Sequence, residues 1–153
     1  RNAYDWNASF DDSLAQLDMN TLEIAAIIGS VYGADAEAAF TELWRNHIWF
    51  FADYTVGLKT NDSQMMMKAK EDLDQYGIDA WAFFGWAIPS VMASDVEKWA
   101  GMHAMQLLMS MDAYDNGDYA MAYMKQREWT KHVEWLASLL VWGIVKQFPS
   151  AFE

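Results

Sequence analysis

The chain has 153 residues, which is the length of one ordinary domain. It contains no cysteine, so disulfides, thiolate nucleophiles and cysteine-ligated zinc sites are excluded. Its formal net charge is −12, and because an acidic surface repels phosphate backbones, nucleic acid is an unfavourable partner. The longest apolar run, Trp135 to Val145, is too short to span a bilayer.

The predicted elements are all helical. Only two prolines occur, at 89 and 149, so long stretches of the chain are free to form helix. Turn-forming residues divide the chain at Gly33, Asn61-Asp62, Pro89-Ser90 and Asn116-Gly117-Asp118. We therefore predict five helices, at 10–32, 35–60, 63–87, 94–115 and 119–148. Because the connections between them are short, we expect one all-α domain over 1–153, an antiparallel up-and-down bundle.

The segment 35–60 has the clearest helical periodicity. Large side chains recur at alternating spacings of four and three residues: Phe40, Trp44, His47, Phe51, Tyr54 and Leu58. This spacing places them on one side of a helix, so we predict that they face the interior of the bundle.

A weak internal repeat relates the second and third helices to the fourth and fifth. A shift of 56 positions places His47 on His103 and Asp62 on Asp118. Each half is then a helix, a short acidic turn and a second helix. The sequence therefore predicts a duplicated helical hairpin. The candidate N-cap residues are Asp62 and Ser63, Ser94 and Asp95, and Asp118.

Four segments carry a resemblance to a known family: IGSVYGADAEAAFTELWRNHI, ADYTVGLKTND, NGDYAMAYMKQRE and IVKQFPSAFE. Together they make the chain similar to a poorly characterised family of secreted helical proteins from Gram-positive bacteria. The resemblance implies paired helices with a histidine near the middle of several of them, an extracellular location, and a further histidine-bearing helix before residue 1. No activity is established for that family, so the resemblance implies fold rather than function.

The chain departs from this family in its tryptophan and methionine residues, of which it has 9 and 11. At 100° per residue, Trp49 lies about 200° from His47, among charged residues. Trp86 likewise falls opposite the apolar side of its helix. Two further stripes lie apart from the predicted inward faces: Met102, Met105 and Met109 on the fourth helix, and Met124, Trp135 and Trp142 on the fifth.

These residues predict a hydrophobic binding surface on the outside of the bundle. Tryptophan and methionine are enriched where proteins contact one another, and an exposed apolar patch is an aggregation hazard unless it has a use. We interpret the chain as a strongly diversified or engineered bundle whose partner is a protein, an amphipathic helix or a second copy.

The three histidines support an alternative function. His47, His103 and His132 all fall on predicted inward faces, and three imidazoles that converge in a bundle bind copper, zinc or haem iron. Met102 and Met105 flank His103, and thioethers suit Cu(I). Against this, the Glu-x-x-His pairs of di-iron bundles do not occur, because the residues three before the histidines are Trp44, Ala100 and Trp129.

Motifs for catalysis are missing from the sequence. It contains no G-x-S-x-G, no phosphate-binding loop, no dinucleotide-binding glycine pattern and no HExxH. Acidic pairs such as Asp11-Asp12 are typical of solvated helix faces. We therefore expect no enzymatic activity. A pocket for a small apolar ligand, lined by Trp44, His47, Phe51 and His103, is a third hypothesis.

Overall fold

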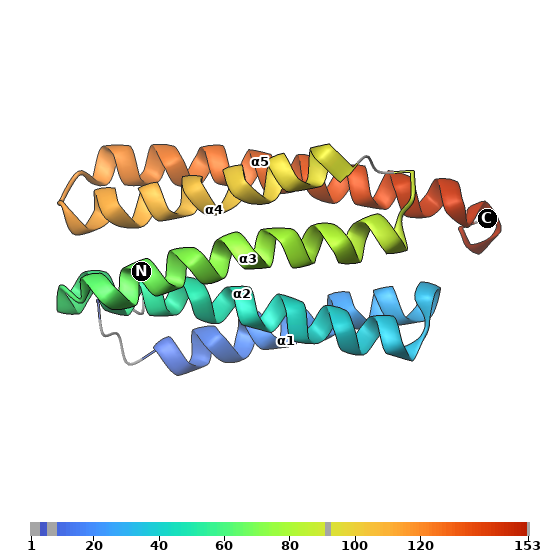
Figure 1. Cartoon of the computed structure of the whole chain (residues 1–153), viewed down its shortest axis with the longest axis horizontal. Coiled ribbons are helices and arrows are strands. Elements are labelled where there is room, and N and C mark those ends of the chain that lie inside the picture. Colours follow the sequence, from blue (N-terminus) through green and yellow to red (C-terminus); the bar gives the residue numbers. More distant parts are fainter. Residues whose placement is uncertain (1–3, 6–8, 91–92, 153) are drawn as a thin grey trace. The chain divides into compact units, whose positions relative to one another are not determined.

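The computed structural model describes residues 4–5, 9–90 and 93–152, without the side chains of 93–100. The chain forms five α-helices and a final 3-10 turn (Figure 1): α1 (Phe10–Tyr32), α2 (Ala34–Thr60), α3 (Ser63–Ala87), α4 (Ala93–Asp115), α5 (Tyr119–Gln147) and η1 (Pro149–Ala151). The described residues contain no β-strand. The predicted all-α class is confirmed, and each predicted helix boundary lies within a residue of the observed one.

The helices form two compact units, Arg1–Tyr76 and Gly77–Glu153. The boundary falls inside α3, which is one continuous helix. The first unit therefore holds α1, α2 and the first half of α3. The second holds the remainder of α3 with α4 and α5.

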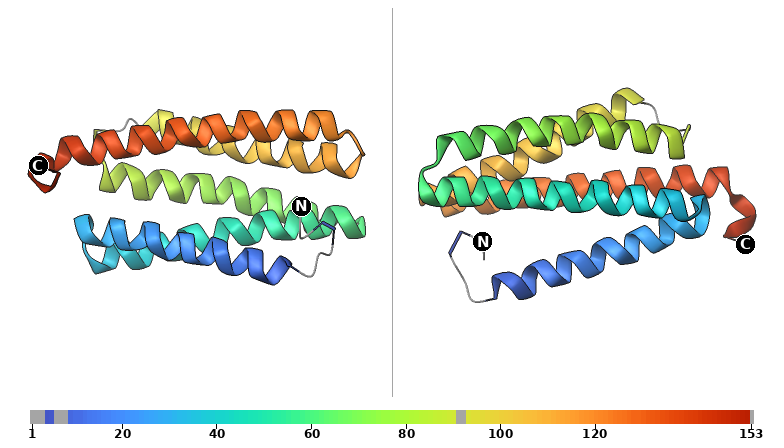
Figure 2. Two further views of the ribbon diagram at one scale, coloured as in Figure 1. Left: turned by 180° about the vertical axis from the view of Figure 1, so that it is seen from behind. Right: turned by 60° about the horizontal axis from the view of Figure 1, so that its bottom comes forward.

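In the first unit, α1 and α2 run antiparallel against each other (Figure 2). Phe40 and Tyr54 on α2 are almost fully buried, and Ala25 and Ile28 of α1 are buried as well. His47 also lies on this inward side, as the spacing of large residues in the sequence predicted. Burial of these side chains removes apolar surface from water, which is the main stabilising contribution to such a unit.

In the second unit, α4 and α5 form an antiparallel hairpin. Ala122, His132 and Gly143 are the buried residues of α5. The Ser110 hydroxyl on α4 donates a hydrogen bond of 2.9 Å to the Ala122 carbonyl, which joins the two helices near their connecting turn. Ile88, just after α3, is completely buried.

The turns before α3 and α5 have the same hydrogen-bond pattern. Asn61 and Gly117 both adopt left-handed backbone conformations, with φ of 56° and 75°. Each is followed by an aspartate, Asp62 or Asp118, whose Oδ1 accepts a 3.0 Å bond from the backbone N–H three residues later. This is the bonding of an N-cap residue, and the two turns lie 56 positions apart. The repeat predicted from the sequence is thus present in the turn geometry.

The two turns differ in the size of the side chains beside them. A Cβ atom placed on Gly57 would lie 2.8 Å from Cγ of Met66, so glycine is needed for this close approach. At the corresponding positions of the second turn the residues are Ala113 and Ala122. The first turn thus pairs a glycine with the long side chain of Met66, whereas the second turn pairs two alanines.

Candidate functional site

The outer face of α5 carries an exposed apolar stripe made of Met124, Trp135 and Trp142, which we call the α5 stripe. At 100° per residue the three positions fall within roughly 20° of one another. Trp142 is 52% exposed and Trp135 44% exposed. Of the buried residues of the same helix, His132 and Gly143 lie roughly 80–100° away around the axis and Ala122 lies about 160° away. The stripe is therefore distinct from the face that packs within the unit.

Basic side chains outnumber acidic ones around the α5 stripe, where Glu128 and Glu134 are also exposed. Arg127, Lys131 and Lys146 are all exposed, and Lys146 Nζ lies 4.6 Å from the centre of the Trp142 ring in a cation–π contact. Glu128 on the same side forms an ion pair of 2.9 Å with Lys125. α5 contains four basic and two acidic side chains, which is the reverse of the balance in the whole chain.

The outer face of α2 combines one tryptophan with acidic residues. Asp35, Glu42, Trp49 and Asp53, which we call the α2 stripe, lie within roughly 40° of one another. All four side chains are exposed, and Trp49 is 52% exposed. A tryptophan with that much surface in water is a residue available for contact, and its neighbours give the contact a negative charge.

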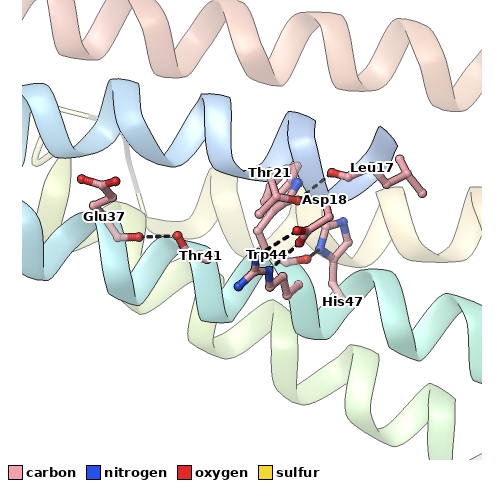
Figure 3. Close-up of polar contacts among 8 residues, drawn as sticks. Leu17, Asp18, Thr21, Glu37, Thr41, Trp44 and His47 are labelled. Carbon is pink, nitrogen blue, oxygen red and sulfur yellow. Dashed lines mark hydrogen bonds and ion pairs between the residues drawn. The ribbon is translucent and has the colours of Figure 1, made fainter. Parts of the chain in front are cut away.

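A shallow hollow of about 210 Å³ lies beside Trp49, between α1 and α2. Its lining consists of Leu14, Ala15, Asp18, Arg45, Ile48 and Trp49. Arg45 donates two hydrogen bonds, of 2.5 and 2.9 Å, to the Asp18 carboxylate (Figure 3). These bonds hold the pKa of the Asp18 carboxyl below its ordinary value. The charge of Arg45 is thereby neutralised at the edge of the α2 stripe.

Other residues of the predicted surface are distributed over α3 and α4. Trp86 is 64% exposed and lies 6.3 Å from the Phe83 ring, measured between centroids. On α4, Met105 and Met109 are exposed, whereas Met102 is half-buried. The exposed methionines are therefore two of the three that the sequence grouped together.

His47 is a buried histidine of the first unit. Its Nδ1 donates a hydrogen bond to the Trp44 carbonyl (Figure 3). Its ring stacks on Tyr76, with 4.9 Å between centroids and 16° between planes. Burial lowers the pKa of His47 to about 4, an effect that the bond to Trp44 partly opposes. At neutral pH the ring is uncharged and Nε2 carries the lone pair.

His103 and His132 belong to the second unit. The Trp129 indole donates a 3.3 Å hydrogen bond to Nε2 of His103, so this nitrogen is engaged by the chain itself. His132 is buried on α5. Among the residues that the structure describes, no group of three or more His, Asp or Glu side chains is placed to hold a metal ion. Copper, zinc and haem binding remain predictions made from the sequence.

Two features of this surface were not foreseen. The contact between Asp18 and Arg45 joins residues 27 positions apart, and helical periodicity carries no signal for such a pair. The basic character of α5 and the acidic character of α2 could have been found in the sequence by counting the charged residues of each predicted helix.

No described helix combines the length and the apolar character that crossing a membrane requires. Comparison of the chain with protein-family models, with curated proteins and with solved structures gives no match. The resemblance to secreted Gram-positive helical proteins is therefore still a prediction, and the fold and its exposed residues are the basis for a functional proposal.

Proposed function

We propose that this chain is a non-catalytic interaction protein that binds a helical protein surface through the α5 stripe. One observation carries the proposal. Met124, Trp135 and Trp142 share one exposed side of a helix whose other side is already buried in its own unit. Much of the apolar surface of these three side chains remains in water, and an interface would bury it.

The energetic scale supports an interface. Full burial of a large apolar side chain stabilises by roughly 1.5–3 kcal/mol, and tryptophan is among the residues that most often dominate binding energy. Trp135 and Trp142 are about half exposed, so together they offer about 1.5–3 kcal/mol, before the entropic cost of association. Met124 adds a flexible apolar contact that adapts to the shape of a partner.

The experiment combines sizing with peptide binding. Light scattering over a concentration series measures self-association, and fluorescence anisotropy measures binding to labelled amphipathic helical peptides of acidic, neutral and basic composition. Trp135→Glu and Trp142→Glu place a charge in the α5 stripe and should abolish whichever association the unmodified chain shows. Ala137→Glu is the matched control, because it adds the same charge to another exposed face of α5.

Circular dichroism of each variant confirms that the helices persist. A chain that stays monomeric throughout the series and binds none of the three peptide classes would refute the proposed function. An association that all three variants retain would show that the interface lies elsewhere.

A further inference from the structure

The geometry points to a specific occupant of the α5 stripe: we infer that it is the α2 stripe of a second copy of this chain. This inference rests on the function proposed above and names the partner of the same site. It would make the protein self-associating through two different surfaces, one basic and one acidic, of which every copy carries both.

Charge is the first argument. The tryptophans of the α5 stripe are accompanied by Arg127, Lys131 and Lys146, which are exposed and for which the described part of the chain contains no ion pair. An acidic partner satisfies these cations, and the chain as a whole is acidic, with 22 Asp and Glu residues. Opposite charges across an interface favour encounter and fix its register.

The α2 stripe is the complementary surface on the same chain. Asp35, Glu42 and Asp53 are exposed on the side of Trp49, and the one cation at the edge of this side, Arg45, is engaged by Asp18. The surface is therefore an acidic helix face with a tryptophan at its centre. The α5 stripe also places tryptophans at the centre of a helix face, and the cations beside it make that face basic.

The spacing of the residues allows both kinds of contact at once. Consider the two helices antiparallel, with Asp53 of one copy beside Lys131 of the other. Trp49 and Trp135 are each four residues further along and meet. Lys146 is fifteen residues beyond Lys131. On the other helix, Glu42 and Asp35 are eleven and eighteen residues from Asp53. Lys146 therefore lies between these two carboxylates. Apolar and charged pairs thus coincide in one register.

Charge reversal tests the assignment. Glu42→Lys with Asp53→Lys makes the α2 stripe basic, and Lys131→Glu with Lys146→Glu makes the α5 stripe acidic. Each double variant should raise the dissociation constant of self-association at least about tenfold, because like charges then face each other. A chain with all four changes should associate again, and so should an equimolar mixture of the two double variants.

The design separates this contact from an effect of net charge. The first double variant is less acidic overall than the unmodified chain, so a nonspecific loss of repulsion would strengthen its association rather than weaken it. Sedimentation velocity at low and moderate salt gives the constants, and self-association of the unmodified chain should weaken as salt screens the charges.

A disulfide test adds the register. The chain has no cysteine, so Asn46→Cys and Ser138→Cys introduce single thiols, at positions that face each other in the antiparallel arrangement. Mild oxidation of the mixed variants should give a cross-linked dimer, in higher yield than either variant alone.

The outcomes distinguish this inference from the proposed function. A chain that remains monomeric yet binds an amphipathic peptide overturns the inference and leaves the proposed function standing. Self-association that Trp135→Glu abolishes but charge reversal leaves unchanged also overturns the assignment to α2. Failure of the four-change variant to associate, with its helices intact, does the same.

Discussion

We predict that acidification from pH 6.5 to 4 destabilises the protein through His47 in particular. The side chain is only 7% exposed, and burial lowers its pKa from 6.5 to about 4. Between these values the unfolded chain binds a proton at His47 that the folded chain does not bind. The free energy of unfolding therefore rises with pH across this window. The contribution of His47 is fully present above about pH 6.5 and is lost as the pH falls towards 4.

The magnitude follows from the size of the shift. Each pKa unit corresponds to about 1.4 kcal/mol, so the change from 6.5 to about 4 gives roughly 3 kcal/mol. This is a large part of the stability of a small domain. The stacked Tyr76 ring offers no compensating charge, because burial raises the pKa of its hydroxyl and keeps it neutral.

Urea unfolding followed by far-UV circular dichroism at several pH values provides the assay. Carboxylates also titrate in this range, so the unmodified chain is compared with His47→Phe, which keeps a ring against Tyr76 but binds no proton. On acidification the free energy of unfolding of the unmodified chain should fall by about 3 kcal/mol more than that of the His47→Phe variant. Equal pH dependence of the two proteins, or a His47 resonance that titrates near 6.5, would refute the reasoning.

Three further predictions concern single contacts. Asp118→Ala removes the cap of α5 and should lower the free energy of unfolding by about 1 kcal/mol in urea titrations, whereas an unchanged midpoint would mean that water replaces the cap. Phe40→Ala should cost about 3–5 kcal/mol and the exposed Ile27→Ala less than about 0.5 kcal/mol, and similar costs would contradict the assigned core. Arg45→Gln should raise the pKa of Asp18 towards its ordinary value in a carboxyl NMR titration, and no change would show that the pair is open in solution.

Much of the local structure was predictable from the sequence. The residues that end helices are chemically distinctive: Gly33 separates α1 from α2, and Asn61 with Asp62 separates α2 from α3. Because these signals are local, the predicted bounds of α1 and α3 coincide with those observed. The inward side of α2 was equally accessible, since its period depends only on the spacing of large residues.

Relations between distant residues were less accessible. Nothing in the sequence singles out Asp18 among the acidic residues as the partner of Arg45, and the stacking of His47 on Tyr76 joins two different helices. The exposed tryptophans were identified because a helical wheel needs only one helix. The partner proposed for them came from a comparison of the charges on two helices, α2 and α5, which belong to different units.

The size exchange beside the two turns limits how mutations combine in this chain. Gly57→Ala alone should lower the free energy of unfolding, because the added methyl group would overlap with Met66 and the nearby backbone. Combined with Met66→Ala, it reproduces the alanines found at 113 and 122. The second change should therefore restore much of the stability that the first removes. Each position therefore constrains which residues its neighbour can accept, and two duplicated hairpins can drift apart in sequence while their turns keep one shape.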